Sequence, residues 1–207
     1  TLCSPQSSVK KLRNGQMVIG HVPWSSPLEK SLGQVKSTRR IKHVLIYRDP
    51  RDGFASALRW MFYPEIRPAY SEATDKEIQW REGFTNDDQR LSFILTQPRF
   101  WTFPGYERWL LSPNCLAVKF EDLYPEIVEL RHNVLGVVLR RIFDYLEIDA
   151  SSVNAQELYD RVLGKSPTAT TEVDKLGQYK RVFKDEHYAV LDTPEFRKIL
   201  GTFGYEW

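Results

Sequence analysis

Three short apolar runs, each followed at once by turn or helix-cap residues, constrain the fold of this chain more than any other feature. They are Met17 to Val22, His43 to Tyr47 and Leu116 to Phe120. Short runs rich in β-branched and aromatic residues predict buried strands. Helical patterns separate them, and strands that alternate with helices are typical of a parallel sheet with crossover helices. The sequence therefore predicts an α/β fold in which a parallel sheet is flanked by helices.

Two predicted helices carry readable start signals. Asp49 can cap a helix and Pro50 suits its first position, so a helix is expected from Pro50 to about Met61. Thr193 as a cap followed by proline predicts a second helix that runs through Leu200, with Gly201 just past its last turn.

The chain between these helices is less regular. Apolar residues from Val134 to Leu146 follow helical spacing, which predicts an amphipathic helix ending near Ile148. The stretch from Tyr63 to Ser112 is rich in Trp, Phe and Pro, and we expect two short helices and loops that cover a pocket. The six tryptophans are expected to be mostly core, with Trp24 at the mouth of an acceptor site as the exception.

Size and charge limit the possible functions. The chain has 207 residues with no repeat or linker, so residues 1–207 are expected to form one domain. Its 29 Lys and Arg against 27 Asp and Glu give a net charge of +2, which argues against nucleic-acid binding. No apolar run approaches the roughly 20 residues of a spanning helix. Cys3 and Cys115 indicate neither a disulfide framework nor a metal cluster, so we expect reduced thiols, no metal and a cytoplasmic protein.

The segment from His43 to Ser56 is the most informative for function. A strand that ends on Arg48 and turns directly into a capped helix directs a guanidinium and free helix N–H groups the same way. Ser56 on the second turn of that helix could add a hydroxyl donor beside them. The pattern predicts a site for a small anion. The alternative is that Arg48 simply pairs with Asp49 or Asp52 at the helix start.

The run from Tyr47 to Ser56 resembles the 3'-phosphate-binding motif of sulfotransferases that use 3'-phosphoadenosine 5'-phosphosulfate (PAPS). The eight-residue spacing between arginine and serine matches. The resemblance implies that Arg48 and Ser56 hold the 3'-phosphate. It also implies a P-loop-NTPase-like three-layer architecture.

Three further segments resemble the family in the same order along the chain. His21-Val-Pro23 looks like the strand end whose histidine is the catalytic base, so the resemblance implies that role for His21. Lys119 to Leu123 is similar to the family's Tyr-Glu-Asp-Leu strand end. Leu176 to Phe183 looks like the C-terminal PAPS-binding loop, which implies that Lys175, Gly177 and Lys180 contact the cofactor.

The sequence departs from the family in two respects. The Gly-rich loop that holds the phosphosulfate should precede His21, and we expect it upstream of Thr1, so that the first strand, loop and helix of the fold are missing. In the C-terminal loop, Glu172 and Asp174 would oppose a phosphate, which leaves Lys175 and Lys180 to supply the charge.

The expected function is transfer of a sulfuryl group from PAPS to the hydroxyl of a carbohydrate or another small-molecule alcohol. Two alternatives remain open: a degenerate module that binds a nucleotide or a protein partner without turnover, and a P-loop kinase acting on a small molecule. His21 could also be an ordinary histidine that satisfies a backbone group at a strand end. The sequence predicts no oligomeric state and no particular acceptor.

Overall fold

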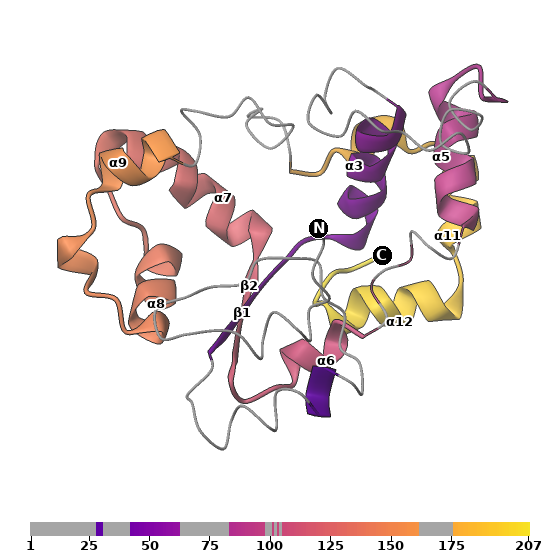
Figure 1. The fold of residues 1–207 in the computed structure, drawn as a ribbon. Helices are drawn as coiled ribbons and strands as arrows, with labels where there is room; N and C mark the ends of the chain where they lie inside the picture. Colours follow the sequence, from indigo (N-terminus) through magenta and orange to yellow (C-terminus); the bar gives the residue numbers. More distant parts are fainter. Residues whose placement is uncertain are drawn as a thin grey trace.

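The computed structural model describes residues 28–30, 42–62, 83–97, 101, 103, 105–161 and 176–207. Within these residues the fold is mixed α/β, with two parallel strands and many helices (Figure 1). The elements are β1 (His43–Tyr47), α3 (Pro50–Phe62), α5 (Asp87–Thr96), α6 (Glu107–Leu110), β2 (Cys115–Lys119), α7 (Phe120–Glu129), η3 (Leu130–His132), α8 (Val137–Leu146), η4 (Ala150–Ser152), α9 (Ala155–Tyr159), α10 (Tyr179–Val182), α11 (Asp185–Leu191) and α12 (Pro194–Thr202).

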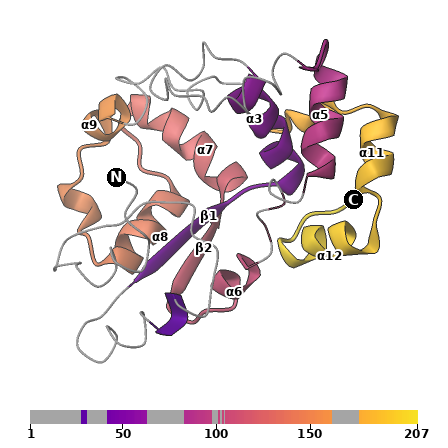
Figure 2. The same cartoon turned by 45° about the vertical axis from the view of Figure 1, so that its right-hand side comes forward.

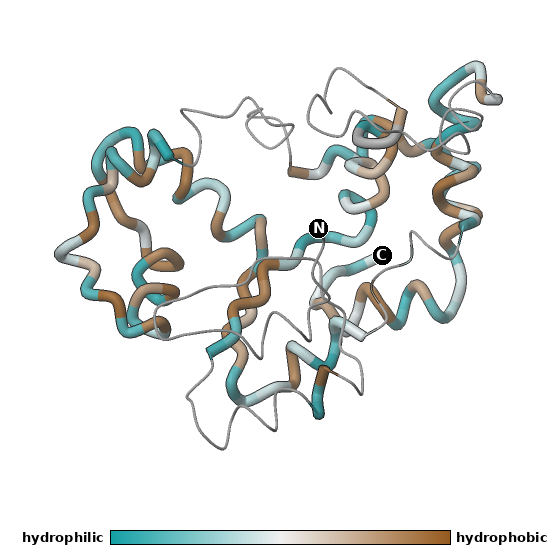
Figure 3. The backbone as a smooth tube through the Cα atoms, in the orientation of Figure 1, coloured by the Kyte–Doolittle hydropathy of each residue, from teal (hydrophilic) through white to brown (hydrophobic). Residues whose placement is uncertain are grey.

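The two strands pair in parallel over their full length. His43 lies opposite Cys115 at one end, and Tyr47 lies opposite Lys119 at the other. The middle of the pair is hydrophobic, and the chain turns hydrophilic where β1 leads into α3 (Figure 3). Because parallel strands end at the same edge of a sheet, the first turns of α3 and α7 lie close together.

The helices form two groups, one on each side of the strand pair. In Figures 1 and 2, α7, α8 and α9 lie to one side, and α3, α5, α11 and α12 lie to the other. Each group has its own apolar cluster. Phe54, Ile94 and Phe196 are at most 1% exposed in the cluster of α3, α5 and α12. Val118 and Leu130 are equally buried in the cluster of β2, α7 and α8. Full burial of such side chains stabilises the fold by about 1.5–3 kcal/mol each.

Most expected elements are present, with shifted ends. The strand expected to end at Phe120 ends at Lys119, because Phe120 is the first residue of α7 and packs on Tyr124 one helical turn later, with ring centroids 5.2 Å apart. The last helix does not stop at Gly201: α12 continues to Thr202, and the left-handed glycine that follows it is Gly204 (φ 72°). Val134 lies before α8, which ends at Leu146. The expected strand from Met17 to Val22 lies outside the described residues.

The region from Tyr63 to Ser112 contributes α5 and α6 to the described structure. Both bury residues in the protein interior: Leu91, Ile94 and Leu95 on α5 and Trp109 on α6. Trp109 is therefore core, as expected. None of the helices in the described parts of the chain is long and apolar enough to cross a bilayer.

Candidate functional site

The candidate site lies where β1 runs into α3. Asp49 caps the helix: its side chain accepts a hydrogen bond from the Arg51 backbone N–H at 2.9 Å. The same carboxylate holds the Arg51 guanidinium by two hydrogen bonds, Nε to Oδ1 at 2.9 Å and Nη2 to Oδ2 at 2.7 Å. Both residues are buried, and the guanidinium also lies 4.4 Å from the centre of the Tyr179 ring. A bidentate pair of this kind fixes the first turn of α3 and neutralises the Asp49 charge.

Arg48 lies between the end of β1 and this first turn, and it is partly buried. Burial lowers the pKa of its guanidinium, while the charges of Asp52, Glu121 and Asp49 raise it. Nevertheless no ion pair or hydrogen bond of the Arg48 guanidinium is found among the described residues. The alternative in which Arg48 pairs with Asp49 or Asp52 is therefore wrong for the described structure, because Asp49 pairs with Arg51 and Asp52 binds elsewhere.

Asp52 binds the C-terminal part of the chain rather than its own helix. Its carboxylate accepts hydrogen bonds from the backbone N–H groups of Gly177, at 2.8 Å, and of Tyr179, at 3.0 Å. These contacts join residues about 125 positions apart in the sequence. Burial raises the pKa of Asp52, and the two backbone hydrogen bonds and Arg48 oppose that shift. Asp52 thus holds the turn before α10 against the first turn of α3.

The backbone conformation of this turn requires a glycine at position 177. Gly177 has a φ of 69°, in the left-handed region that side chains other than glycine rarely adopt. This conformation allows its N–H to face Asp52. Lys180 follows in α10, is exposed, and lies 5.9 Å from the centre of the Tyr179 ring. The structure thus brings two of the expected cofactor contacts, Gly177 and Lys180, to the helix that follows Arg48.

Ser56 lies four residues after Asp52 on α3, so the two residues share one face of the helix. It is partly buried, and its hydroxyl has no hydrogen bond among the described residues. Asp52 and Ser56 therefore lie on successive turns of the helix that follows Arg48.

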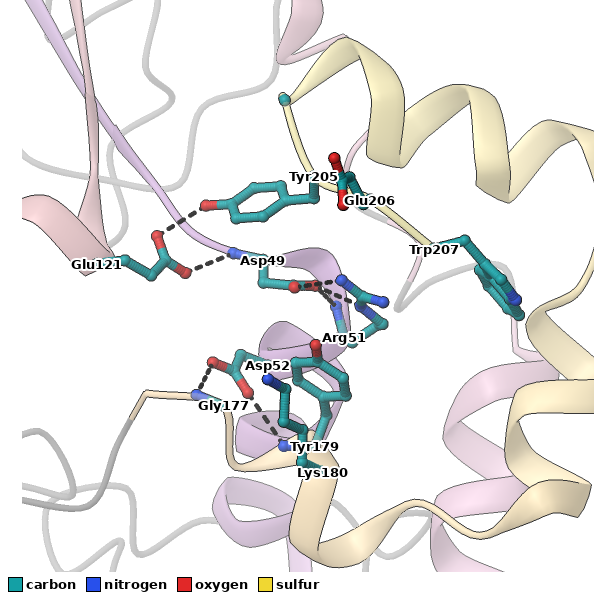
Figure 4. A pocket seen from close by; sticks show the side chains of 11 residues that line it. Asp49, Arg51, Asp52, Glu121, Gly177, Tyr179, Lys180, Tyr205, Glu206 and Trp207 are labelled. Atoms are coloured by element: carbon teal, nitrogen blue, oxygen red, sulfur yellow. Dashed lines mark hydrogen bonds and ion pairs between the residues drawn. The ribbon is translucent and has the colours of Figure 1, made fainter.

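Asp52 also lines a pocket of about 530 Å³ (Figure 4), whereas Arg48 and Ser56 are not among its described lining residues. Four chain segments line it: the start of α3, the first turn of α7, the turn and helix at 177–180, and the last residues of the chain. The lining residues are Asp49, Arg51, Asp52, Glu121, Gly177, Tyr179, Lys180, Gly204, Tyr205, Glu206 and Trp207. None of the described residues between Tyr63 and Ser112 is part of this lining, and the expectation that the region covers a pocket stays a prediction.

Glu121 links the start of α3 to the last residues of the chain and was not recognised as a site residue from the sequence. It lies in the first turn of α7, and its Oε1 accepts the backbone N–H of Asp49 at 2.9 Å. Its Oε2 accepts the hydroxyl of Tyr205 at 2.7 Å. An acidic residue directly after a predicted strand, at the same sheet edge as Arg48, was the signal available in the sequence. Nothing in the sequence pairs that residue with Tyr205.

The last residues of the chain are anchored to β1 and β2. Lys119 donates to the Gly204 carbonyl at 2.8 Å, and its ammonium lies 4.5 Å from the centre of the Tyr205 ring. The rings of Tyr47 and Tyr205 meet edge to face, with centroids 6.5 Å apart. Burial, and after it the hydrogen bond to Glu121, raises the pKa of Tyr205. The phenol therefore remains a protonated donor at neutral pH.

The remaining expected site residues lie outside the described structure. His21 and Lys175 are among them, as are Glu172 and Asp174. Their positions relative to Arg48 stay predictions.

The structure describes three other histidines, and none of them lines the pocket. His43 opens β1 at the far end from Arg48 and lies 4.8 Å from the Trp109 ring, measured between centroids. His132 is exposed, and His187 is fully buried.

One group of side chains has the composition of a metal site. Asp88, Glu186 and His187 bring their potential ligand atoms within 4.8 Å of one another. However, Nδ1 of His187 accepts the Lys184 N–H at 3.0 Å, and Lys184 also pairs with Asp88 through its ammonium. These contacts connect α5 to α11, and this structural role accounts for the proximity of the three side chains.

Comparison of the chain with known protein families, with curated proteins and with solved structures finds no match.

Proposed function

We propose that this protein binds PAPS and transfers its sulfuryl group to the hydroxyl of a carbohydrate or another small-molecule alcohol. The observation that carries the proposal is the Arg48 guanidinium, which lies at the start of α3 without an ion-pair partner among the described residues. A free cation beside a helix N-terminus attracts a phosphate, since both the charge and the helix dipole favour an anion there.

Ser56 favours a nucleotide that carries a 3'-phosphate. Its hydroxyl, on the same face of α3 as Asp52, can donate to an anion held by Arg48. A nucleotide with a 3'-phosphate has a group for this pair to bind, whereas ATP has none.

The arrangement of the strands supports a P-loop-like three-layer architecture for the whole fold. Both β1 and β2 are parallel and lead directly into helices at one edge of the sheet, and ligands of such sheets bind outside this edge. The turn containing Gly177 meets the same edge through Asp52.

In the reaction we propose, His21 accepts the proton of the acceptor hydroxyl while the acceptor oxygen attacks sulfur. The new S–O bond forms as the bond between sulfur and the 5'-phosphate oxygen breaks, and adenosine 3',5'-bisphosphate leaves. Such transfers depend mainly on positioning and on positive charge near the leaving group. Arg48 and Ser56 anchor the nucleotide and do not touch the reacting atoms.

The test compares two nucleotides that differ only at the 3' position. Isothermal titration calorimetry of the wild-type protein is expected to show tighter binding of adenosine 3',5'-bisphosphate than of adenosine 5'-monophosphate. Arg48→Met should weaken the bisphosphate roughly ten- to hundredfold, as the loss of a charged hydrogen bond implies. Ser56→Ala should weaken it less, and neither change should affect the monophosphate. Arg140→Met, which removes an exposed arginine of α8, is the matched control.

Equal binding of the two nucleotides by the wild-type protein would contradict the proposal. A second measurement follows transfer of ³⁵S from PAPS to a panel of alcohols, in which His21→Ala should abolish transfer and leave bisphosphate binding unchanged. Specific binding without transfer would favour the nucleotide-binding module instead.

A further inference from the structure

The carboxylates around Arg48 could compete with a phosphate for its guanidinium. A partly buried arginine close to carboxylates gains energy by pairing with one of them, and such a pair would compete with a phosphate. Asp49, Asp52 and Glu121 all lie near enough to act on the charge of Arg48. Yet none of them pairs with it in the described structure.

Each of these carboxylates is held by other donors. Asp49 binds the Arg51 guanidinium and backbone. Asp52 binds the backbone N–H groups of Gly177 and Tyr179. Glu121 binds the Asp49 N–H through one oxygen and the Tyr205 hydroxyl through the other.

Glu121 is the carboxylate whose restraint can be removed selectively. The N–H that it accepts belongs to the peptide joining Arg48 to Asp49, so its head group lies within one residue of Arg48. Its other oxygen is held 2.7 Å from a single side-chain hydroxyl, that of Tyr205 (Figure 4). Without this hydroxyl, Oε2 would lose its partner and could turn toward the guanidinium.

The Tyr205 ring has its own anchors. It packs against the Lys119 ammonium and the Tyr47 ring, and the Gly204 carbonyl beside it is held by Lys119. Removing the hydroxyl alone should therefore leave the ring in position and change only the partner of Glu121.

We propose that Tyr205 is a positioning residue that holds Glu121 away from Arg48 and so keeps the guanidinium available for a phosphate. The identity of that phosphate ligand rests on the proposed function. The restraint on Glu121 does not, and it can be tested in the free protein.

The first experiment measures Arg48 itself. NMR of protein labelled with ¹⁵N-arginine reports the Nε–H of each guanidinium, and Arg48→Lys assigns the signal. In the wild-type protein we expect rapid rotation about the Nε–Cζ bond and rapid hydrogen exchange. In Tyr205→Phe, pairing with Glu121 should slow both. In the double variant Tyr205→Phe with Glu121→Gln, the neutral amide pairs weakly, so both rates should return toward wild type.

The second experiment measures adenosine 3',5'-bisphosphate binding in the same proteins. Tyr205→Phe should weaken binding about tenfold, the order of one charged hydrogen bond. Glu121→Gln in that background should restore most of the loss. If Tyr205 only stabilised the fold, the double variant would bind no better than the single one.

The two experiments separate the two proposals. An unchanged Arg48 signal in Tyr205→Phe, or slowed rates that persist in the double variant, would overturn the role of Tyr205. The expected NMR behaviour in a protein that does not prefer the bisphosphate would contradict the proposed function alone. Circular dichroism and the unfolding midpoint of each variant confirm that the compared proteins are folded.

Discussion

Substitution of Gly136 by alanine should destabilise the protein through a side chain on another helix. Gly136 is the N-cap of α8 and has ordinary extended backbone angles, φ −75° and ψ 177°, so alanine causes no backbone strain. The space beside it is filled by Glu126 of α7. A Cβ at Gly136 would lie 2.2 Å from the Glu126 Cδ. The Glu126 carboxylate must therefore move.

The expected cost comes from the contacts that Glu126 would lose. Its two oxygens accept the backbone N–H groups of Val138 at 2.9 Å and Leu139 at 2.8 Å, so Glu126 replaces the cap that a glycine cannot provide. Loss of a side-chain cap costs about 1 kcal/mol, and loss of a carboxylate at the helix N-terminus about 0.3–1 kcal/mol more. Alanine also makes the unfolded chain less flexible than glycine does, which offsets about 0.4–1 kcal/mol of this cost. Gly136→Ala should therefore cost about 1 kcal/mol.

Urea denaturation measures this cost as a lower midpoint at unchanged slope. In a Glu126→Ala background, Gly136→Ala should cost nothing or stabilise slightly, because no carboxylate is left to displace. Gly201→Ala is the matched control: none of the described atoms lies within 4 Å of a Cβ there, so it should stabilise α12 by about 1 kcal/mol. An equal cost of Gly136→Ala with and without Glu126 would refute the reasoning.

Three further predictions concern stability. Phe196→Ala removes a fully buried ring that packs against Trp101 and should cost about 3–5 kcal/mol in urea denaturation, whereas Val190→Ala at an exposed position should change little. Arg51→Met leaves the buried Asp49 carboxylate without its bidentate partner and should cost about 3–5 kcal/mol; a cost below 1 kcal/mol would contradict the geometry. Burial raises the pKa of Asp52 above 3.8 in the folded protein. Ionisation of Asp52 therefore lowers the free energy of unfolding as the pH rises from 3.8 through the folded pKa. The free energy of unfolding of Asp52→Asn should decline less over this pH range than that of the wild-type protein.

The local structure at the start of α3 was predictable because the signals lie next to one another in the sequence. The apolar run of β1, the Asp49 cap and Pro50 act within a few residues, and the structure has the strand and helix at those positions. The end of α12 was predicted wrongly for a related reason. Gly201 looked like a terminator, but an open surface position tolerates glycine inside a helix, and the chain turns only at Gly204.

Contacts within the site were much harder to predict. The sequence offered Asp52 as a possible partner of Arg48 at the helix start, yet its carboxylate binds a turn about 125 residues later. Glu121 and Tyr205 are 84 positions apart and form a hydrogen bond at the pocket. A single sequence carries no signal for such pairs, because a carboxylate pairs with whichever donor the fold brings to it.

The sequence by itself determined the strand-to-helix junction that carries Arg48, because backbone propensities and caps are local. Only the tertiary structure decided the state of Arg48. Its acidic neighbours in the sequence suggested an ion pair, but Arg51, the 177–179 turn and Tyr205 occupy the carboxylates around it. The hydrogen-bond partners of a carboxylate depend on which donors the whole fold brings to it. Here two of the donors that occupy the carboxylates around Arg48 come from the turn before α10 and from the end of the chain.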